Sequence, residues 1–295
     1  MAIMPQPMKL VVVLTTLSAF ALIVVQLAGG QQLRRGGRVP LPEQEKAAIA
    51  EGFTGLTTDG NVVEGLFQVR STGVSTDPVR KSAEAFLNGL SDAQRETTLF
   101  KVDDDEWRKW ANQHHYLRQG VSFAKMDERQ RQLAFELIGS GLSARGLQTT
   151  RDIMRLNETL AELKQNWNEY GEWLYHITIM GKPSATEPWG WQLEGHHVVI
   201  NYFVLGDQVV MSPVFVGSEP IRAAKGKFKG VVVMQDEQDK GLKLIQALDA
   251  EQRKQAILSD VKSGNNALTQ AYRDNVDLDY AGIPGEKLNA KQQAL

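Results

Sequence analysis

The chain has 295 residues, of which 42% are hydrophobic and 23% are charged, a composition typical of ordinary globular proteins. Its 33 basic and 35 acidic residues give a formal net charge of −2, so a surface built to bind nucleic acid is not expected. The absence of cysteine excludes disulfides, thiolate catalysis and thiolate metal sites. Any metal ion must therefore be bound by imidazole, carboxylate or carbonyl groups.

The N-terminal segment has the pattern of an export signal. Residues 10–30 carry no charge and follow a short head whose only basic side chain is Lys9. We expect residues 1–30 to be either a signal peptide, cleaved after the small residues 28–30, or a retained membrane anchor. Arginines at 34, 35 and 38 follow the apolar run, which favours cleavage. The sequence thus predicts an extracytoplasmic protein, secreted or periplasmic, that contacts a membrane only through this segment.

A linker and a single domain are expected after the signal. Residues 31–50 contain Gly36-Gly37, Pro40 and Pro42 and are expected to be a linker before a domain at 51–295. The turn residues Asp59-Gly60, followed by the apolar stretch 62–69, predict a β-hairpin. Asp77-Pro78 predicts the start of a helix, because proline is well tolerated in the first turn.

One local pattern occurs four times: an apolar residue, a capping residue, two free positions and a glutamine. The cap side chain can accept a hydrogen bond from the amide three residues later, and the glutamine can reach back to the cap, so each copy predicts a helix start. The irregular spacing favours independent capping boxes over a solenoid repeat. The four caps are Ser91, Asp127, Asp249 and Asn289. Because the last helix has fewer than two turns before Leu295, we expect the chain to end inside an element.

The rest of the chain alternates hairpins with paired helices. Helices are expected at about 128–138, 144–165, 236–247 and 250–259, and strands at 175–180, 191–205, 208–215 and 231–234. Gly206-Asp207 is the expected turn after the long strand. Since the pattern lacks βαβ alternation, the predicted fold class is α+β, with antiparallel hairpins packed against paired helices in one domain.

The candidate site lies in the segment Glu187–His197, at the head of the long strand. Glu194 and His196 are expected on the same strand face, with His197 on the opposite face. The two histidines could reach one ion only if Gly195 formed a bulge. With His176 and the pair His114-His115, they would form a site for a divalent transition metal, with His196, His197 and His176 as ligands. The alternative is that these histidines only satisfy hydrogen bonds within a half-buried hairpin.

Two further features of the sequence have competing interpretations. Trp189 and Trp191 share one strand face, and such pairs are more often core residues than a ligand platform. With Tyr202 they are nevertheless candidate ligand-binding residues. The acidic run 103–106 lacks the glycine and the closing glutamate of an EF-hand loop and is expected to be a solvated turn.

The chain resembles the domain-of-unknown-function 3500 family of exported, uncharacterised proteins, from about residue 78 to its end. The most specific residues of the resemblance are Pro188-Trp-Gly-Trp191, Gly195-His-His197, Asn201, Pro213 and Phe215-Val-Gly217. The family pattern continues past the equivalent of Leu295, so the resemblance implies a C-terminally truncated member. It implies export and the position of a site, but no established reaction.

Two functions from different classes are consistent with these patterns. The leading hypothesis is an exported metal-dependent enzyme, a hydrolase or an oxidoreductase, with Glu194 as a general base or a further ligand. The alternative is a noncatalytic exported protein that binds a carbohydrate or another small organic molecule through its aromatic residues.

Overall fold

The computed structural model describes residues 43–261 and 273–295. The helices in these ranges are α1 (Glu43–Ala50), α2 (Asp77–Gly89), α3 (Asp92–Thr98), α4 (Glu128–Gly141), α5 (Ala144–Lys164), α6 (Gln235–Ala247), α7 (Ala250–Ala256) and α8 (Ala290–Gln293), with 3-10 turns η1 (Asp105–Arg108), η2 (Phe123–Lys125) and η3 (Gly285–Lys287). The strands are β1 (Leu56–Thr57), β2 (Leu99–Phe100), β3 (Val121–Ser122), β4 (Tyr175–Met180), β5 (Trp189–Gly195), β6 (Val198–Leu205), β7 (Gln208–Val210), β8 (Val214–Val216) and β9 (Val276–Asp277). The fold class is α+β, as predicted.

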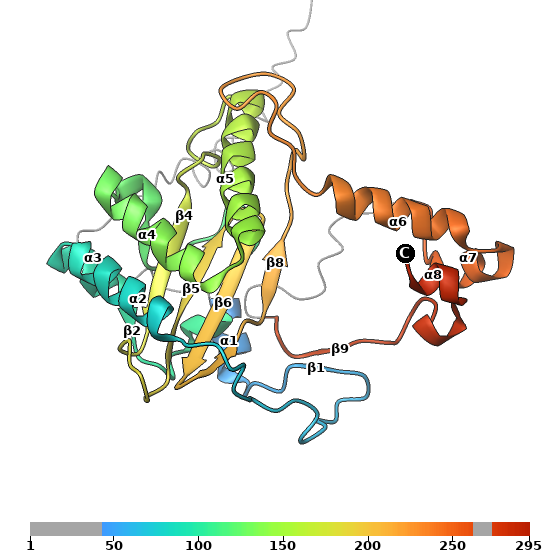
Figure 1. Ribbon diagram of the computed structural model, residues 1–295, viewed down its shortest axis with the longest axis horizontal. Helices are drawn as coiled ribbons and strands as arrows, with labels where there is room; N and C mark the ends of the chain where they lie inside the picture. Colours follow the sequence, from blue (N-terminus) through green and yellow to red (C-terminus); the bar gives the residue numbers. More distant parts are fainter. Residues whose placement is uncertain (1–42, 262–272) are drawn as a thin grey trace, which may run out of the picture. The chain divides into compact units, whose positions relative to one another are not determined.

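The main sheet is built around three long antiparallel strands. Its order is β2-β4-β5-β6-β7, with β3 also paired to β4 and β8 to β6 (Figure 1). Strands β4, β5 and β6 pair antiparallel, and β2 runs parallel to β4. A second, two-stranded sheet pairs β1 with β9 in parallel.

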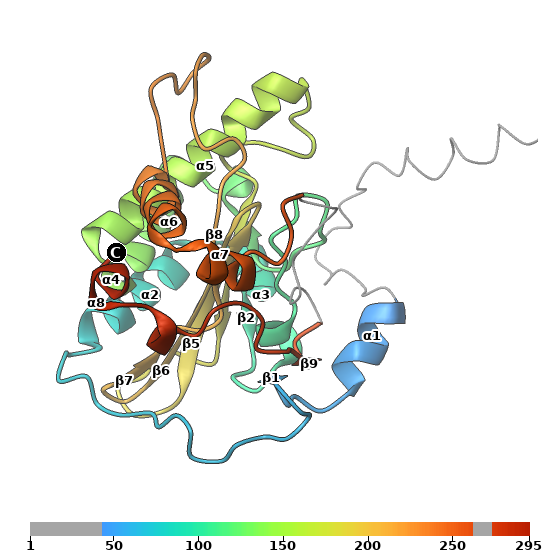
Figure 2. The same cartoon turned by 90° about the vertical axis from the view of Figure 1, so that its right-hand side faces the viewer.

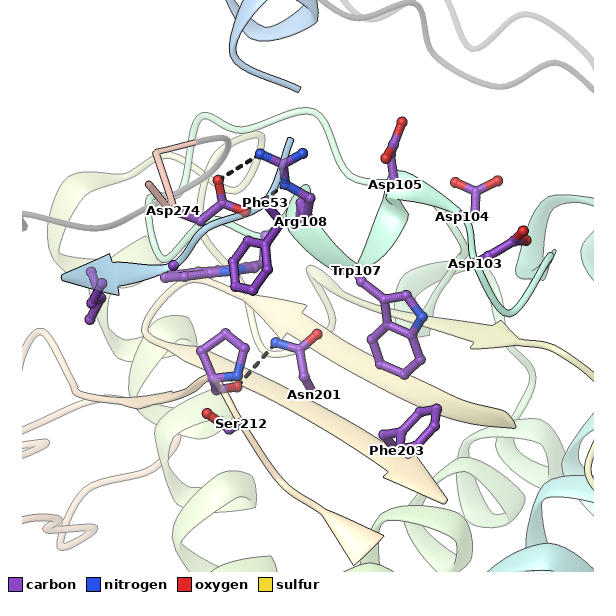
Figure 3. Close-up of a pocket in the computed structure, with 14 residues that line it drawn as sticks. Phe53, Asp103, Asp104, Asp105, Trp107, Arg108, Asn201, Phe203, Ser212 and Asp274 are labelled. Carbon is purple, nitrogen blue, oxygen red and sulfur yellow. Dashed lines mark hydrogen bonds and ion pairs between the residues drawn. The ribbon is translucent and has the colours of Figure 1, made fainter. Parts of the chain in front are cut away.

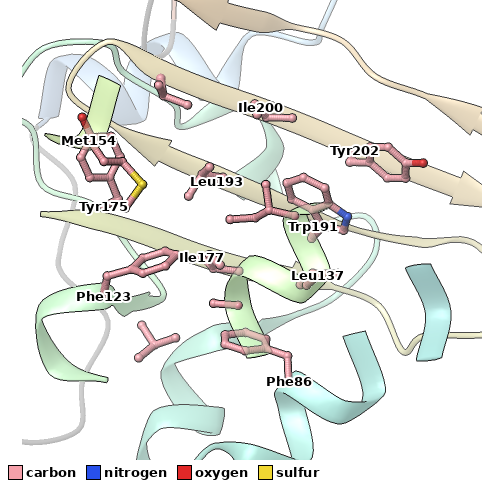
Figure 4. Packing of buried hydrophobic residues seen from close by; sticks show 14 of the residues in the cluster. Phe86, Phe123, Leu137, Met154, Tyr175, Ile177, Trp191, Leu193, Ile200 and Tyr202 are labelled. Carbon is pink, nitrogen blue, oxygen red and sulfur yellow. The ribbon is translucent and has the colours of Figure 1, made fainter. Parts of the chain in front are cut away.

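Helices α2, α4 and α5 cover one face of the main sheet (Figures 1 and 2). This face presents every second residue of the strands, including Tyr175, Ile177, Trp191 and Leu193, and all four side chains are fully buried. Figure 4 shows them packed against Phe86, Leu137 and Met154 from the helices. The sheet is amphipathic, because the opposite face carries the polar side chains of Gln192, Glu194 and Asn201.

The segment 101–120 covers the polar face. The Gln192 amide donates to the Glu106 carbonyl at 3.4 Å, and the Ala111 amide donates to the Glu194 carboxylate at 3.1 Å. Helix α1 packs against this segment, since Ala48 and Ile49 contact Ala111. Residues 43–50 are therefore a helix rather than part of the linker expected at 31–50, whose remainder lies outside the described residues. The expected signal or anchor at 1–30 also lies outside them, and the helices that the structure describes include none suited to crossing a membrane.

The hairpin predicted around Asp59-Gly60 does not form. Gly60 adopts the expected positive φ of 79° at the turn, but residues 61–70 pair with no strand and leave side chains such as Phe67 exposed. Leu56 and Thr57 instead pair with Val276 and Asp277, more than two hundred residues later. The turn conformation of Gly60 is as predicted, whereas the pairing partner of Leu56 and Thr57 is a segment far away in the sequence. The strand expected at 231–234 is likewise replaced by a single bridge between Arg222 and Val232.

All four predicted capping boxes form, but they are not independent. In α3 and α4, Gln94 and Gln130 exchange hydrogen bonds of 3.1 and 2.9 Å between their amide groups. Each amide also donates to the carbonyl two residues before the other helix's cap, at Lys125 and Gly89. The boxes therefore form a reciprocal pair that joins two helix starts.

The same pair occurs again between α7 and α8. Gln252 and Gln292 exchange hydrogen bonds of 3.1 and 2.7 Å and donate to the carbonyls of Lys287 and Ala247, which again lie two residues before the caps. A helix of 13 residues precedes each pair, α2 in one case and α6 in the other, and a 3-10 turn precedes each second cap. The segments 77–98 and 123–130 thus share one local architecture with the segments 235–256 and 285–293, which replaces the interpretation of four unrelated boxes.

The reciprocal pair predicts energetic coupling between Gln94 and Gln130. Each single substitution to alanine should lower the free energy of unfolding by about 1–2 kcal/mol, because it removes amide hydrogen bonds and leaves carbonyls without a donor. In urea titrations, the double variant should lose at least ~0.5 kcal/mol less unfolding free energy than the two single variants lose together. Gln132→Ala, an exposed glutamine on the same helix, is the control with an effect within about 0.5 kcal/mol. Strictly additive costs would show that the two boxes act separately.

Candidate metal centre

The two histidines of the Gly-His-His segment form the turn between β5 and β6. Strand β5 ends at Gly195 and β6 begins at Val198, and His197 has φ 65°, in the left-handed region that non-glycine residues seldom adopt. The alternation of strand faces therefore stops before His196, and the two imidazole rings lie side by side with centroids 4.0 Å apart. The prediction that they point to opposite faces is wrong, because it assumed one continuous strand at 191–205.

Three hydrogen bonds hold the backbone of this turn. The Tyr175 hydroxyl donates to the His196 carbonyl at 2.7 Å, the His197 amide donates to Asn112 at 3.0 Å, and the Gly217 amide donates to His197 at 2.9 Å. Gly195 makes the first of these possible, since a Cβ there would overlap the Tyr175 ring. The glycine of the motif is thus required by close packing, and the left-handed residue is held by surrounding structure.

The ring of His196 is oriented by Asn157 of α5. His196 Nδ1 lies 2.9 Å from Asn157 Oδ1, and the Asn157 amide nitrogen donates to the Gly171 carbonyl at 2.8 Å. Because Oδ1 only accepts, Nδ1 must carry the ring proton, which leaves a lone pair on Nε2. Burial, assisted by His197 and His114, lowers the pKa of His196 to about 2. The imidazole is therefore neutral and suited to bind a metal through Nε2.

Aromatic and acidic side chains from two loops surround the turn. The rings of His114 and Tyr170 lie 5.4 and 5.7 Å from the His196 ring, between centroids. His114 Nε2 is 3.2 Å from the Tyr170 hydroxyl and 3.4 Å from Glu169 Oε2. Burial lowers the pKa of His114, and the neighbouring His115 acts in the same direction. Four of the five histidines of the sequence therefore gather here.

A group of three ligand atoms converges at the turn. One nitrogen from each of His196 and His197 and one carboxylate oxygen of Glu219 lie within 4.8 Å of one another. In the described residues, these three side chains form the group whose spacing suits a metal ion. The carboxylate oxygen Glu219 Oε2 is 3.8 Å from His197 Nε2. His196 is buried and Glu219 is exposed, so one side of the group faces solvent. Atoms this close together can be bridged by one ion, since zinc bonds of about 2.0–2.2 Å place two ligand atoms up to about 4 Å apart.

Glu194 lies on the sheet rather than in the turn. Its two oxygens are directed to the Ala111 amide, at 3.1 Å, and to the Arg118 guanidinium, at 3.6 Å, and both charged side chains are almost completely buried. Burial raises the pKa of Glu194 to about 7, against the opposing effect of Arg118. Arg118 also donates to the carbonyls of Ala111 and Gln113. These contacts fasten the loop that carries His114 onto β5; the role of general base for Glu194 stays a prediction.

His176 is not brought to the turn. It lies opposite Glu194 in the register of β4 and β5, because strand periodicity directs both to the polar face. Burial lowers its pKa to about 3, and Arg118 and Lys125 act in the same direction. The group of converging ligand atoms in the described ranges contains His196 and His197 but not His176.

The predicted aromatic platform belongs to the core. Trp189 and Trp191 are fully buried, and Tyr202 stacks on Trp191 with ring centroids 5.1 Å apart. Their face of the sheet is covered by helices, so they cannot line an open pocket; the competing interpretation as core residues fits the structure.

Sequence reasoning missed Glu219, Asn157 and Tyr170. Asn157 lies inside a helix and is 39 residues from His196, so no local pattern connects the two. Glu219 lies two residues after Gly217, whose amide donates to the His197 carbonyl, and the family resemblance of Phe215-Val-Gly217 is the nearest signal in the sequence.

Comparison with known families agrees with the resemblance seen in the sequence. The family model described as "Protein of unknown function (DUF3500)" matches residues 72–295, more than half of the chain. The chain belongs to this family. No curated protein and no solved structure matches it.

Substitution of Gly195 tests the packing that positions the turn. Gly195→Ala should lower the free energy of unfolding by about 1–3 kcal/mol, because the new methyl group must displace the Tyr175 ring. Tyr175→Phe, which removes only the hydrogen bond to His196, should cost about 1 kcal/mol. Both values come from urea unfolding curves. A Gly195→Ala variant as stable as the wild type would contradict this account of the motif.

The half-buried, neutral state of His176 predicts a pH dependence of stability. Its pKa of about 3 in the folded chain lies below the ordinary value of 6.5, so unfolding takes up a proton as the pH falls below 6.5. The stability that this residue contributes is complete above pH 6.5 and is lost towards pH 3, by at most about 1.4 kcal/mol per pH unit. The unfolding free energies of wild type and His176→Gln should therefore converge between pH 7 and pH 5. Parallel profiles would argue against a neutral His176.

Proposed function

We propose that the chain is an exported metal-dependent hydrolase whose metal ion is bound by His196, His197 and Glu219. Support for export comes from the uncharged run at 10–30 that follows Lys9, a segment outside the described residues. Support for the metal comes from the converging ligand atoms of His196, His197 and Glu219. Membership of the family leaves the reaction open.

The observation that carries the proposal is the convergence of three ligand atoms at a firmly held turn. His197 keeps a left-handed backbone in a turn fixed by three hydrogen bonds, and the result is that its ring lies beside that of His196. Asn157 fixes the ring proton of His196 on Nδ1, the arrangement common around metal-bound histidines. A positive φ is common in two-residue hairpin turns, so the support for a metal comes from the adjacent rings and from the fixed ring proton of His196.

The proposed ligand set leaves room for a substrate or a water molecule. Two imidazoles and one carboxylate are the protein ligands of many catalytic zinc sites, which keep a further position open. A bound ion would supply Lewis acidity and lower the pKa of a coordinated water. The same set also suits non-haem iron, so the neighbouring residues decide between the two chemistries.

His114 and Tyr170 favour hydrolysis over oxidation. The lowered pKa of His114 keeps its imidazole neutral and able to take a proton from water, and the adjacent Glu169 would stabilise the resulting imidazolium. The Tyr170 hydroxyl, 3.2 Å from His114, is a proton donor on the same side of the cluster. In this proposal Glu194 is a positioning residue, because its carboxylate and Arg118 hold the loop that carries His114.

Metal content provides the direct test. The full chain, loaded with Zn²⁺ and then dialysed, should retain one zinc per chain by elemental analysis, and added Zn²⁺ should raise its Tm, because a ligand that binds only the folded state stabilises it. His196→Ala and Glu219→Gln should each weaken zinc binding by at least about tenfold, since each removes a ligand.

Two comparisons make this result specific. Glu187→Gln, an exposed glutamate before β5, is the control for Glu219→Gln and should keep the zinc. Retention of zinc by the double variant His196→Ala/His197→Ala would place the ion elsewhere. Absence of stoichiometric zinc, copper, iron and manganese in the wild-type chain would remove the proposal.

A further inference from the structure

A cavity of about 580 Å³ lies on the polar side of the sheet, apart from the histidines. It is enclosed by the segment after α1, by the loop around η1 and by β6 with the residues that follow β7 (Figure 3). Asn201, which lines it, is four residues beyond His197, or about 13 Å along an extended strand. The cavity volume is within the range of sites that hold small organic ligands.

Aromatic rings form most of its apolar wall. Phe53, Trp107, Trp110 and Phe203 line the cavity, and Figure 3 shows the rings of Phe53 and Trp107 on either side of Asn201. The Trp107 ring meets Phe203 edge to face, with centroids 6.3 Å apart, and its Nε1 donates to the Val102 carbonyl at 2.8 Å. With this polar atom satisfied inside the protein, Trp107 presents only ring surface to a ligand.

Gly190, between the two core tryptophans, makes room for this wall. A Cβ at Gly190 would overlap the Tyr202 carbonyl oxygen of β6 and would lie 2.7 Å from the tip of the Trp107 indole, closer than carbon atoms approach. The central glycine of the Trp-Gly-Trp segment therefore allows the indole of Trp107 to lie against β5. The most specific motif of the sequence thus contributes to the cavity through its glycine rather than through its tryptophans.

The charged side chains that line the cavity have an excess of negative charge. Arg108 is neutralised by Asp274, at 2.7 and 3.0 Å, and also donates to the carbonyls of Ile49 and Glu51. Asp103 and Asp105 are exposed at the rim. An anionic ligand would therefore meet carboxylates, and a cationic ligand would be attracted by them.

The amide of Asn201, at the floor of the cavity, is already used within the protein. Asn201 Oδ1 accepts from Gln192 at 2.6 Å, and its amide nitrogen donates to the Pro213 carbonyl at 3.0 Å. A carbohydrate binds through several converging hydrogen-bonding groups, and the two that lie among the aromatic rings, Trp107 Nε1 and the Asn201 amide, are engaged. Aromatic ring faces and nearby carboxylates instead suit a ligand that carries a positive charge on an apolar skeleton.

We propose that this cavity binds a small organic cation, an amine or quaternary ammonium compound with an aromatic or branched apolar body. The cation would lie against the faces of Trp107 and Phe53, within the field of Asp103 and Asp105. This ligand site is distinct from the metal centre and does not depend on it.

Calorimetric titration of the full chain after EDTA treatment tests the site with benzyltrimethylammonium as the probe. The probe should bind in the millimolar range or tighter and quench tryptophan fluorescence. Its uncharged isostere neopentylbenzene should bind about tenfold more weakly, because it lacks the cation–π attraction. Benzenesulfonate should not bind.

Substitutions separate the site from nonspecific binding. Trp107→Leu should abolish binding of the probe, whereas Trp167→Leu, at an exposed tryptophan outside the cavity, should leave it unchanged. Should Trp107→Leu fail to fold, Asp103→Asn/Asp105→Asn provides the second test; it should weaken binding about threefold and reduce its salt dependence. Asp92→Asn on α3 is its control. Equal binding of the charged and neutral probes, tighter binding of glucose or cellobiose, or no binding of the ammonium probe would each overturn the proposal.

Discussion

The structure around the histidines depends on the close contact between Gly195 and the Tyr175 ring. Because Gly195 has no Cβ, Tyr175 can pass across the end of β5 and donate to the His196 carbonyl. That bond, with those from Asn112 and Gly217, stabilises a two-residue turn in which His197 has a positive φ. This turn places the imidazole rings of His196 and His197 in contact with each other and close to the Glu219 carboxylate.

The segment 101–120 connects the two candidate sites. Trp107 forms a wall of the cavity at one end of the polar sheet face, and His114 contacts the histidine turn at the other. Between them, Glu194 and Arg118 hold the segment against β5 through a buried ion pair and hydrogen bonds to the backbone. Such a pair is costly to break, because either partner alone would be a buried, uncompensated charge. The same carboxylate therefore supports both regions without belonging to either.

The paired capping boxes show how one local device is used twice. Around Gln130, the shared architecture places Phe86, Leu90 and Leu133 in the core beneath the sheet. In the second copy, Leu248 and Gln292 are buried within the unit itself, whereas Leu242, Leu258 and Leu295 are exposed. The hydrogen-bond pattern is thus a property of the local sequence, and the burial of its apolar face is a property of what surrounds it.

Local patterns in the sequence determined the helix starts, the strand β4, the Gly206-Asp207 turn and the α+β class, because caps and periodicity depend on residues a few positions apart. They also located the Gly-His-His segment and the family. Only the tertiary structure decided the partner of Leu56 and Thr57, the break at His196 and His197, and the union of these histidines with Asn157, Tyr170 and Glu219. These features arise from packing between segments far apart in the chain, such as Tyr175 against Gly195, and such contacts leave no periodic signal in the sequence.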